Sequence, residues 1–498
     1  MTRGRYIGID LAITGPHRAA VMEADGTFVG KSFSFDRSFE GFNYLLKRAT
    51  PQDDPTCKLI FVLVPTSKTW IPLCCFLTQR GYAVFSVTAQ KAAALRKYYN
   101  KHTKSDRIDA QVLAKLPLID RENLNELWLP DSVTGALKGY CKQRDKIVMG
   151  IGDRKRRIQA HFTCANPKLM EAFGEDKFTA VSVAFLRSFV DPFKVKRFGL
   201  EKLTQFLKKH SHGRIRSELP QEIFQACVDT TRIYEQAKAQ GQLPFDFQQV
   251  QDEINIDLDL IEYEEKKVTL LDQKIAELYE KVDPLKALQS LRGFGPVISA
   301  NIMGIVGYFP RFPNVRAYQC FSGGVPKKRQ SSDRDKKGLP ITKAGPRLLK
   351  KSYHMAAETS RKYDVEDAAF YNRLIKRGLH HNQAITAIAR RLAARSYAVM
   401  KRVQEAQQGL RDNNTVPFQL KDLDGHPITS EQARQIVRDK YPSKRKPNKK
   451  KEERTQAQVI SRQSLNSSNM RYGQPLLVGD LLKDISTPNA RQAENIFT

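Results

Sequence analysis

The sequence predicts an α/β domain at the N-terminus followed by a long, mostly helical remainder. Strand-like runs alternate with helical segments over residues 1–115, whereas strand signals are nearly absent between about residues 121 and 250. Residues 251–282 then carry a seven-residue apolar repeat, which is typical of a long helix. A chain of 498 residues has room for roughly three domains, and its apolar content of 41% excludes wholesale disorder.

The N-terminal region shows its strand and helix signals in a defined order. The apolar run YIGIDL at 6–11 predicts a buried strand, and Ala-Asp-Gly at 24–26 predicts a hairpin turn. The continuous apolar run at 58–64 predicts a strand that is covered on both faces. The expected elements are strands at 6–11, 19–22, 27–33, 58–64 and 82–87 and helices at about 68–80 and 90–99. A hairpin followed by alternating strands and helices is the order of a ribonuclease-H-like fold.

The composition indicates a basic protein with a polyphosphate partner. Lysine and arginine number 83 against 53 acidic residues, which leaves a formal charge of +30. An excess of this size favours nucleic acid as the partner. The 7 cysteines form no CxxC pair, which favours free thiols in the cytoplasm over structural zinc. No apolar run reaches the roughly 18 residues of a membrane-spanning helix, and the N-terminus lacks the apolar core of a signal peptide.

The seven-residue repeat predicts a coiled coil. The repeat positions are Ile254, Ile261, Val268, Ile275 and Val282, with Leu271 and Leu278 at the companion position. β-Branched residues at one core position and leucine at the other suit a two-stranded coiled coil. Asp257 and Glu264 occupy companion positions, so we expect looser packing in the early turns. The partner is either a second copy of the chain or an antiparallel helix from residues 130–165, and we favour the second copy, hence a homo-oligomer (dimer or tetramer).

These signals divide the chain into four parts. We expect an α/β domain at 1–120, a basic helical linker with the coiled coil at 121–285, a helical domain at 286–405 and a polar tail at 406–498. The tail contains KRKPNKKKEER at 444–454, which has no periodicity and predicts a solvated, phosphate-seeking segment. We expect the rest of the tail to be disordered apart from short helical pieces.

Three aspartates occupy positions at which a bound metal ion would account for an acidic side chain. Asp10 ends a strand-like run, where aspartate is uncommon, and Mg²⁺ prefers hard carboxylate ligands. Asp106 and Asp109 are three residues apart at a predicted helix start, so their side chains share one face. The alternative to metal binding is a structural role for each aspartate. Asp10 would begin a turn, and Ser105 would cap a helix whose first turn favours acidic residues.

The motifs around these aspartates resemble a known family. GIDLA at 8–12, VPTSKTW at 64–70 and KSDRIDAQVLA at 104–114 look like the landmarks of the DEDD transposases. These are the recombinases of the one-ten insertion-sequence family, relatives of the Piv/MooV-type DNA invertases. The resemblance continues in four further segments, at 291–312, 321–333, 341–357 and 370–392.

The resemblance implies a fold and a mechanism. It implies an N-terminal RuvC-like (ribonuclease-H-like) domain that holds Mg²⁺ with four acids, and a helical C-terminal transposase domain that supplies a serine nucleophile. Asp10, Asp106 and Asp109 match three of the acids, and Ser331 matches the serine, with Ser332 as the alternative. Family members act on donor and target DNA with a structured guide, the bridge RNA, and assemble as tetramers.

Basic residues near these positions are candidates for phosphate contacts. Ser331 stands in a basic segment, and such cations can neutralise a scissile phosphate. The candidate nucleic-acid-binding residues are Lys104, Arg107, Lys327, Lys328, Arg329, Arg334, Lys343 and Arg347.

One position departs from the family pattern. The family's second acid precedes Pro-Thr-Gly, whereas this chain has Val64 before Pro65. Asp53 and Asp54 precede the strand, and Glu23 is a conceivable substitute. Either three aspartates suffice for Mg²⁺, or the metal site is weakened, or the protein has kept binding and lost catalysis. A metal-dependent nuclease that hydrolyses DNA with water also stays open.

Two short motifs have a structural and a functional interpretation. Gly293-Phe294-Gly295 resembles a helix-hairpin-helix turn that grips phosphate, or is a plain turn between helices. His380 and His381 precede a predicted helix and are helix caps or phosphate contacts rather than metal ligands.

Overall fold

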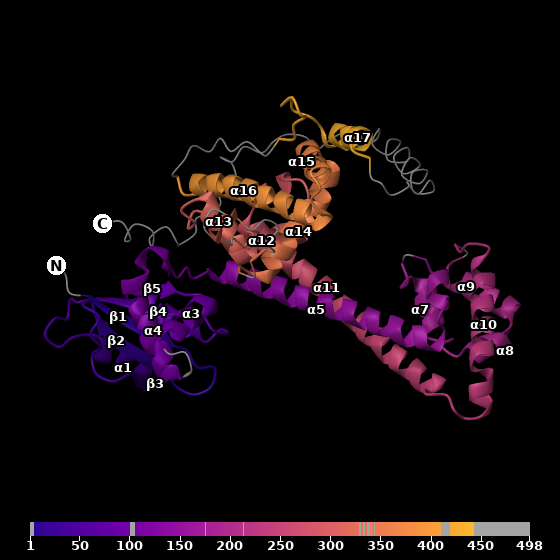
Figure 1. The fold of residues 1–498 in the computed structure, drawn as a ribbon, viewed down its shortest axis with the longest axis horizontal. Helices are drawn as coiled ribbons and strands as arrows, with labels where there is room; N and C mark the ends of the chain where they lie inside the picture. Colours follow the sequence, from indigo (N-terminus) through magenta and orange to yellow (C-terminus); the bar gives the residue numbers. More distant parts are fainter. Residues whose placement is uncertain are drawn as a thin grey trace. The chain divides into compact units, whose positions relative to one another are not determined.

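The chain folds into two compact units that divide between Asp131 and Ser132 (Figure 1). The structure is a computed structural model. It describes residues 4–99, 105–174, 176–212, 214–327, 330–331, 334–335, 339, 341–342, 344–409 and 419–442.

The first unit is built on a mixed sheet of six strands in the order β3-β2-β1-β4-β5-β6. The strands are β1 (Gly4–Asp10), β2 (His17–Glu23), β3 (Phe33–Phe35), β4 (Lys58–Leu63), β5 (Ala83–Ser86) and β6 (Asn125–Glu126). The central strand β1 pairs antiparallel with β2 and parallel with β4, and β4 pairs parallel with β5. The predicted hairpin followed by alternating strands and helices is therefore confirmed.

Helices cover both faces of this sheet (Figure 1). They are α1 (Phe39–Ala49), α2 (Trp70–Thr78), α3 (Ala89–Tyr99) and α4 (Asp106–Ile119), followed by a 3₁₀ turn, η1 (Arg121–Asn123). Apolar side chains of α1 and α2 pack with Ile7, Ile9 and Leu63 on one face. On the opposite face α4 packs against Tyr6 and Val62, and α3 lies beside α4.

The hairpin turn forms where it was expected, and the third strand forms only in part. The amide of Gly26 donates to the carbonyl of Glu23, and Gly26 takes a left-handed φ of +94°. The expected strand at 27–33 forms only in part: Phe28 forms an antiparallel bridge with Met22, the amide of Val29 donates to the carbonyl of Val21 at 2.9 Å, and β3 begins at Phe33. Gly30, with φ +66°, lies between the turn and β3, and extended backbone cannot pass through that conformation.

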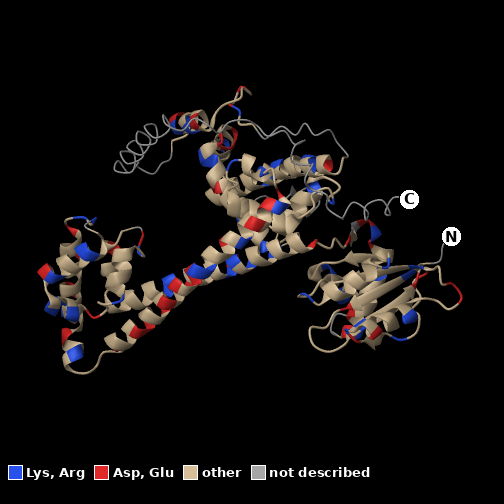
Figure 2. Cartoon of the chain, turned by 180° about the vertical axis from the view of Figure 1, so that it is seen from behind, with Lys and Arg blue, Asp and Glu red and all other residues tan. Residues whose placement is uncertain are grey.

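Two long antiparallel helices form the centre of the second unit. They are α5 (Ser132–Ala165) and α11 (Phe247–Val282), which pack along each other. Ion pairs join Arg144 to Asp272, Arg154 to Glu264, Lys155 to Glu265, Arg157 to Asp257 and His161 to Glu253. From Arg144 to His161 the partner moves from Asp272 back to Glu253, so the helices run in opposite directions. Figure 2 shows the basic and acidic positions side by side along both helices.

The partner of the heptad repeat is therefore α5 of the same chain. Ile254, Ile261 and Ile275 are buried, and apolar residues of α5 share their clusters. The favoured second copy at this repeat is wrong, because the sequence pattern defines one helix face and not what covers it. A homo-oligomer stays a prediction that needs another surface.

Asp257 shows why the early turns hold together. Its side chain is only 4% exposed and accepts hydrogen bonds from Arg157. Those hydrogen bonds, and then the charges of Arg157 and Arg154, hold the pKa of Asp257 below its ordinary value. The basic run at 153–162 is thus largely neutralised by acids of α11, and Asp257 is a well-packed member of the interface rather than the loose one expected.

A separate core closes each end of the helix pair. At one end, Ile158 and Ile254 join a cluster with five short helices. These are α6 (Leu169–Ala172), α7 (Ala180–Leu186), α8 (Pro192–Phe198), α9 (Leu200–His210) and α10 (Leu219–Ala239). At the other end, Leu137 and Ile275 join the core of the C-terminal helices. These elements are η2 (Ala287–Ser290), α12 (Pro296–Val306), α13 (Val315–Ser322), α14 (Arg347–Tyr363), α15 (Val365–Lys376) and α16 (His381–Gln407).

Part of the expected tail is folded. Residues 419–442 contain α17 (Ser430–Lys440), whose Ala433 and Val437 pack against Val365 of α15. Residues 410–418 and 443–498, which include the basic run, lie outside the described residues. No helix in the described ranges is long and apolar enough to cross a membrane.

Candidate active site

The site expected at Asp10 lies at the carboxyl end of the central strand. Asp10 is the last residue of β1 and is half-buried. β1 and β4 are parallel, with Gly8 beside Val62 and Ile9 beside Leu63. Continuing that register places Val64 beside Asp10, so both residues belong to the same edge of the sheet.

Helix α4 brings the other two aspartates to this edge. Ser105 caps the helix, because its hydroxyl accepts a hydrogen bond from the amide of Ile108 at 3.3 Å. Asp106 and Asp109 follow in the first turn, Asp106 exposed and Asp109 half-buried. The helix-start prediction is therefore confirmed.

Gly8 fixes how closely α4 approaches β1. A Cβ atom at Gly8 would lie 2.1 Å from the carbonyl oxygen of Ala110 and 2.2 Å from the amide nitrogen of Ala114. Residues two apart on a strand point to the same face, so the side chain of Asp10 is on the α4 side. Tyr6 packs near Ala114, and Gly8 lies under the turn between Ala110 and Ala114. The next position of this row, Asp10, is therefore directed toward the helix start.

The carboxylates share this edge but are not gathered into a cage. Arg96 of α3 holds Asp109, with its Nη1 atom 2.9 Å and 3.1 Å from the two carboxylate oxygens. Among the described residues, Asp10, Asp106 and Asp109 do not bring three ligand atoms within 4.8 Å of one another. The donor chemistry fits Mg²⁺, which prefers carboxylate oxygens. Holding it would require Asp109 to exchange Arg96 for the metal.

The second acid of the expected set is absent. Val64 packs with Val62 and Leu113 in an apolar cluster beneath α4. The substitute considered at Glu23 is wrong: Glu23 pairs with Arg5 in the strand register and forms an ion pair with it at 2.7 Å. That pair lies at the opposite end of β1 from Asp10. Asp54 also precedes β4, where its carboxylate accepts hydrogen bonds from Thr56.

The predicted nucleophile lies on a hairpin of the second unit. Its paired strands are β7 (Gln330–Ser331) and β8 (Arg334–Asp335), and the register places Ser331 opposite Arg334. Nearer its base, Pro326 forms a bridge with Ile341, and the amide of Thr342 donates to the carbonyl of Val325 at 2.9 Å. Two residues separate Ser331 from Arg334, so the serine stands at the end of the hairpin.

Two glycines hold the base of this hairpin together. Gly323 and Gly345 take left-handed φ angles of +74° and +81°. A Cβ atom at Gly323 would lie 2.4 Å from the carbonyl oxygen of Ala344, and one at Gly345 would lie 2.4 Å from that of Phe321. Both the conformation and the contact require glycine, which fixes where the hairpin leaves the helical core.

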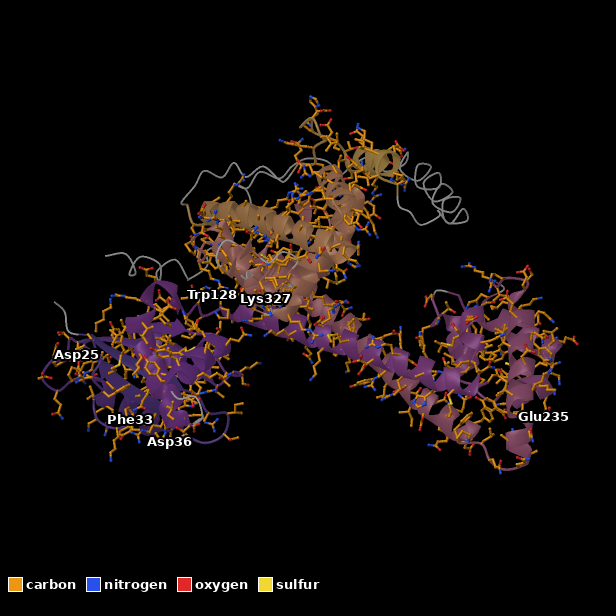
Figure 3. The ribbon with its side chains drawn as sticks, viewed as in Figure 1. Asp25, Phe33, Asp36, Trp128, Glu235 and Lys327 are labelled. Carbon is orange, nitrogen blue, oxygen red and sulfur yellow. The ribbon has the colours of Figure 1, made fainter. Side chains whose placement is uncertain are left out.

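The expected phosphate contacts are described only in part. Arg107 of α4, Lys327 at the start of the hairpin and Arg347 at the start of α14 are exposed (Lys327 is labelled in Figure 3). Arg334 is placed by its backbone alone. Lys104, Lys328, Arg329, Lys343 and the alternative serine, Ser332, lie outside the described residues.

The two ambiguous motifs have structural roles. A Cβ atom at Gly293 would lie 2.2 Å from the carbonyl oxygen of Ala356, so this glycine lets the turn pack against α14. The side chain of His380 caps α16 in a capping box with Gln383, and His381 lies 2.7 Å from Glu358. The helix-cap interpretation of His380 is therefore confirmed.

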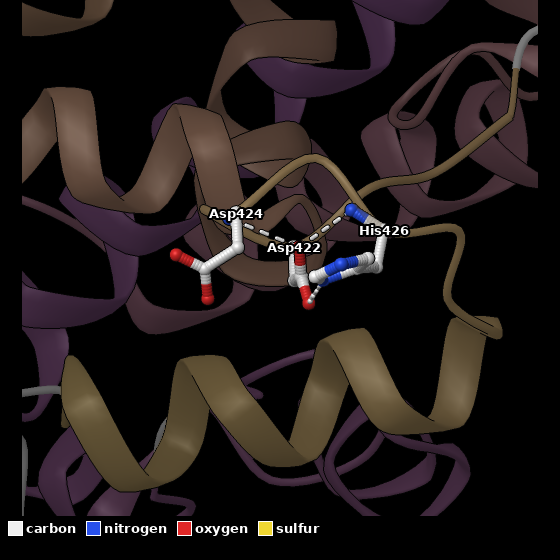
Figure 4. A group of neighbouring side chains, drawn as sticks. All are labelled: Asp422, Asp424 and His426. Carbon is white, nitrogen blue, oxygen red and sulfur yellow. Dashed lines mark hydrogen bonds and ion pairs between the residues drawn. The ribbon is translucent and has the colours of Figure 1, made fainter.

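One group in the described ranges has metal-ligand spacing, and no motif in the sequence predicts it. Asp422, Asp424 and His426 lie together in the loop before α17 (Figure 4). The amides of Asp424 and His426 donate to the carboxylate of Asp422 at 3.0 Å and 2.8 Å, which lowers the pKa of Asp422. Asp424 and His426 are exposed. These contacts are those of a polar turn, which explains the grouping without a metal.

Sequence reasoning also missed Arg96 and His17. Arg96 has no motif of its own, and nothing in the sequence shows that residues 96 and 109 meet. His17 is fully buried, and its Nδ1 accepts a hydrogen bond from the amide of Ala12 at 3.1 Å. Burial, and then the charge of Arg37, lowers the pKa of His17 to about 4.

Comparisons with known proteins agree with these landmarks. A family model described as a DEDD transposase matches residues 7–167, and a second, for transposases of the IS116/IS110/IS902 family, matches residues 285–372. The chain is similar to the 44.8 kDa protein of insertion element IS116 from Streptomyces clavuligerus, with 22% identity over 401 residues. It is equally similar, over 411 residues, to the 43.6 kDa protein of insertion element IS110 from Streptomyces coelicolor. Each alignment covers 80% of this chain and 94% of the relative.

The acids of the sheet edge fall in the first match and the serine hairpin falls in the second. This combination defines a transposase of the DEDD type, an enzyme class that binds and cuts DNA. The chain belongs to the IS110 family of these transposases.

Proposed function

We propose that this transposase cuts and rejoins DNA through Ser331, with Mg²⁺ held by Asp10, Asp106 and Asp109, and that a structured guide RNA directs it to donor and target DNA. The observation that carries the proposal is the sheet edge itself. Gly8 allows α4 to lie directly on β1, and Asp10 therefore faces the turn that contains Asp106 and Asp109.

The proposed reaction transfers a phosphoryl group to the serine. The Oγ atom of Ser331 gives up its proton and forms a bond to the DNA phosphorus while the bond from phosphorus to the 3′ oxygen breaks, and that oxygen takes up a proton and leaves as a hydroxyl. The covalent link conserves the bond energy for rejoining. Lys327, Arg334 and Arg347 carry charges that would neutralise the phosphate. Bound Mg²⁺ would supply polarisation of the phosphate and stabilisation of the leaving oxygen.

Two architectural assignments belong to this proposal. We assign the sheet unit to the RuvC-like class on its strand order, in which an antiparallel β1–β2–β3 meander continues into parallel β4 and β5. We assign α5 and α11 to an antiparallel coiled coil on their heptad pattern and ion pairs. The division at residues 120, 285 and 405 and the oligomeric state are part of the same proposal.

Val64 supports a second candidate, a nucleic-acid-binding protein with weakened or lost catalysis. Its side chain packs in an apolar cluster at the position where the family has an acid. Asp109 is also held by Arg96. In this case the protein would bind DNA in EDTA and would cut no strand. A metal-dependent nuclease is the third candidate.

A denaturing-gel assay for a covalent protein–DNA adduct separates these functions. The protein is expressed with its flanking genomic sequence, so that a guide RNA is present, and incubated with labelled donor DNA and Mg²⁺. Ser331→Ala, Ser332→Ala and Val64→Glu run beside the parent, with Ser217→Ala, an exposed serine of the second unit, as the matched control.

Each outcome assigns one function. An adduct that Ser331→Ala alone abolishes supports the proposal, whereas an adduct that survives both hairpin substitutions refutes a serine nucleophile there. An adduct only after Val64→Glu indicates a scaffold that has lost its metal site. Cut DNA without an adduct indicates the nuclease, and binding without cutting in every lane indicates the binder.

A further inference from the structure

Most cations of α5 have acidic partners, but those at one end do not. Arg144, Arg154 and Arg157 each pair with an acid of α11. Lys138 and Lys142 are one helical turn apart, and within the described part of the chain neither forms an ion pair with a carboxylate. Residues four apart lie on the same helix face, so the two ammonium groups are neighbours.

A third cation joins them from the C-terminal core. The positive charges of Lys142 and Arg311 both act on Lys138 and, after burial, lower its pKa. The guanidinium of Arg311 lies 4.5 Å from the ring centre of Phe312 and 5.2 Å from that of Phe321. Burial lowers the pKa of Arg311 to about 10. Holding the Lys138 ammonium in partly dry surroundings beside the positive charge of Lys142 costs free energy that an added anion would offset.

The packing holds this arrangement in place. A Cβ atom at Gly304 of α12 would lie 2.9 Å from the backbone nitrogen of Lys138, so α12 presses directly on α5 at this residue. Lys138 and Arg311 are half-buried, and Lys142 is exposed. The cluster therefore has two anchored cations and one that reaches solvent.

The cluster also adjoins the serine hairpin. Phe321, which the Arg311 guanidinium covers, lies two residues before Gly323 at the hairpin base, and its carbonyl oxygen lies against Gly345. An anion held by the cluster would thus lie next to the base of that hairpin.

We propose that Lys138, Lys142 and Arg311 form a binding site for the phosphodiester backbone of a nucleic acid. The proposal rests on the nucleic-acid function proposed above and extends it to a surface outside both candidate catalytic segments. Lys146, one turn beyond Lys142 and also exposed, continues the row. The row lets the backbone run along α5 toward the hairpin.

The test uses the full chain and the salt dependence of binding. Fluorescence anisotropy gives the Kd of a labelled DNA duplex and of a labelled single-stranded RNA of the same sequence over a series of NaCl concentrations. The variants are Lys142→Gln and the double change Lys138→Gln with Lys142→Gln. Lys155→Gln is the matched control, because Lys155 lies on the same helix and pairs with Glu265.

Lost phosphate contacts reduce the slope of log Kd against log [NaCl] by about 0.9 each for duplex DNA and about 0.7 each for single strands. We expect the slope of the double variant to fall by the amount for one to two lost phosphate contacts with at least one probe, and Lys155→Gln to keep the parent slope. A change with one probe alone identifies which nucleic acid uses the site. An unchanged slope with both probes overturns the site, as does an equal loss in Lys155→Gln.

A stability control and the binding of the parent separate the possible causes of a negative result. Lys142 is exposed, so Lys142→Gln cannot act by unfolding the core, and a circular dichroism melt checks the double variant. If the parent binds neither probe, the proposed function fails together with the site. If the parent binds and the variants match it, only the site fails.

Discussion

Replacing Gly8 with alanine should separate α4 from the sheet. The new methyl group would lie 2.1 Å from the carbonyl oxygen of Ala110, and ordinary contact begins at 3.4 Å, so the helix would have to move by about 1.3 Å. Backbone atoms of a helix cannot move aside individually, so α4 would have to shift as a whole. Its buried side chains, Leu113 and Leu116 among them, would lose contact with the sheet.

The expected cost follows from the size of this clash. Overpacking a core usually costs about 1–3 kcal/mol, and a contact with the helix backbone belongs at the upper end, near 3 kcal/mol. For a unit of this size, that corresponds to a fall in melting temperature of roughly 10 °C. The two tryptophans of the chain, Trp70 and Trp128, both belong to the first unit, so fluorescence reports the unfolding of that unit.

Gly4 supplies the matched control. It lies on the same strand, and a Cβ atom there would meet only the carbonyl oxygen of Lys58 at 3.6 Å, an ordinary contact. Gly4→Ala should leave the melting temperature within a degree or two, because alanine also restricts the unfolded chain. A Gly8→Ala variant that melts with the parent, or a Gly4→Ala variant that is equally destabilised, would refute the tight contact of α4 with Gly8.

Three further outcomes follow from burial and pairing. The pKa of His17 is about 4 in the folded chain and about 6.5 in the unfolded chain, so lowering the pH through that interval should destabilise the first unit by at most about 3 kcal/mol. His17→Asn can still accept a hydrogen bond from the Ala12 amide and should make the melting temperature, measured by fluorescence, less dependent on pH in that interval; a parent whose melting temperature is already constant there contradicts the lowered pKa. Asp257→Asn should lower the melting temperature measured by circular dichroism, with a loss of stability of about 1–3 kcal/mol, whereas Asp257→Leu should lose less because an apolar residue suits the interface between α5 and α11. The reverse order would show that the ion pair is not buried as described. Iodoacetamide should modify the exposed Cys320 rapidly and leave Cys141 intact, because burial raises the pKa of the Cys141 thiol to about 12; equal labelling in a mass-spectrometric map would contradict this.

The sheet could be predicted because its signals are local. An apolar run such as 58–64 defines a buried strand by itself, and Ser105 followed by two acids defines a helix start. Both elements form within a residue or two of the expected position. The strand expected at 27–33 is interrupted, because Phe28 still pairs with β2 but the left-handed backbone of Gly30 ends that pairing.

The helix pair shows where local signals end. The repeat from Ile254 to Val282 predicted a helix with one apolar face, but covering that face with α5 or with a second copy satisfies the same pattern. The choice depends on whether α5 offers cations opposite Asp257, Glu264 and Asp272. Matching charges over more than 100 residues of sequence is a property of the folded chain.

The residues of the candidate site could be predicted from local motifs, but their contacts with one another could not. Asp10, Asp106 and Asp109 stand in short motifs, and the strand and helix that carry them were expected. The pairing of Arg96 with Asp109 and the close approach at Gly8 depend on how α3, α4 and β1 pack. Because residue types alone do not encode that packing, the sequence named the acids but not the arginine that holds one of them.

The antiparallel pair of α5 and α11 also affects how the chain can change in length. The helices bring Ala165 and Phe247 back to the same end of the pair, where their own core holds them together. For a flexible connection, each doubling of its length adds only about 0.6 kcal/mol of closure entropy. Helices can therefore be gained or lost between these two residues at little thermodynamic cost, while the core at the opposite end, which carries the serine hairpin, keeps its geometry. Neither family model reaches residues 168–284, and the five short helices lie in that interval, where the architecture tolerates variation most easily.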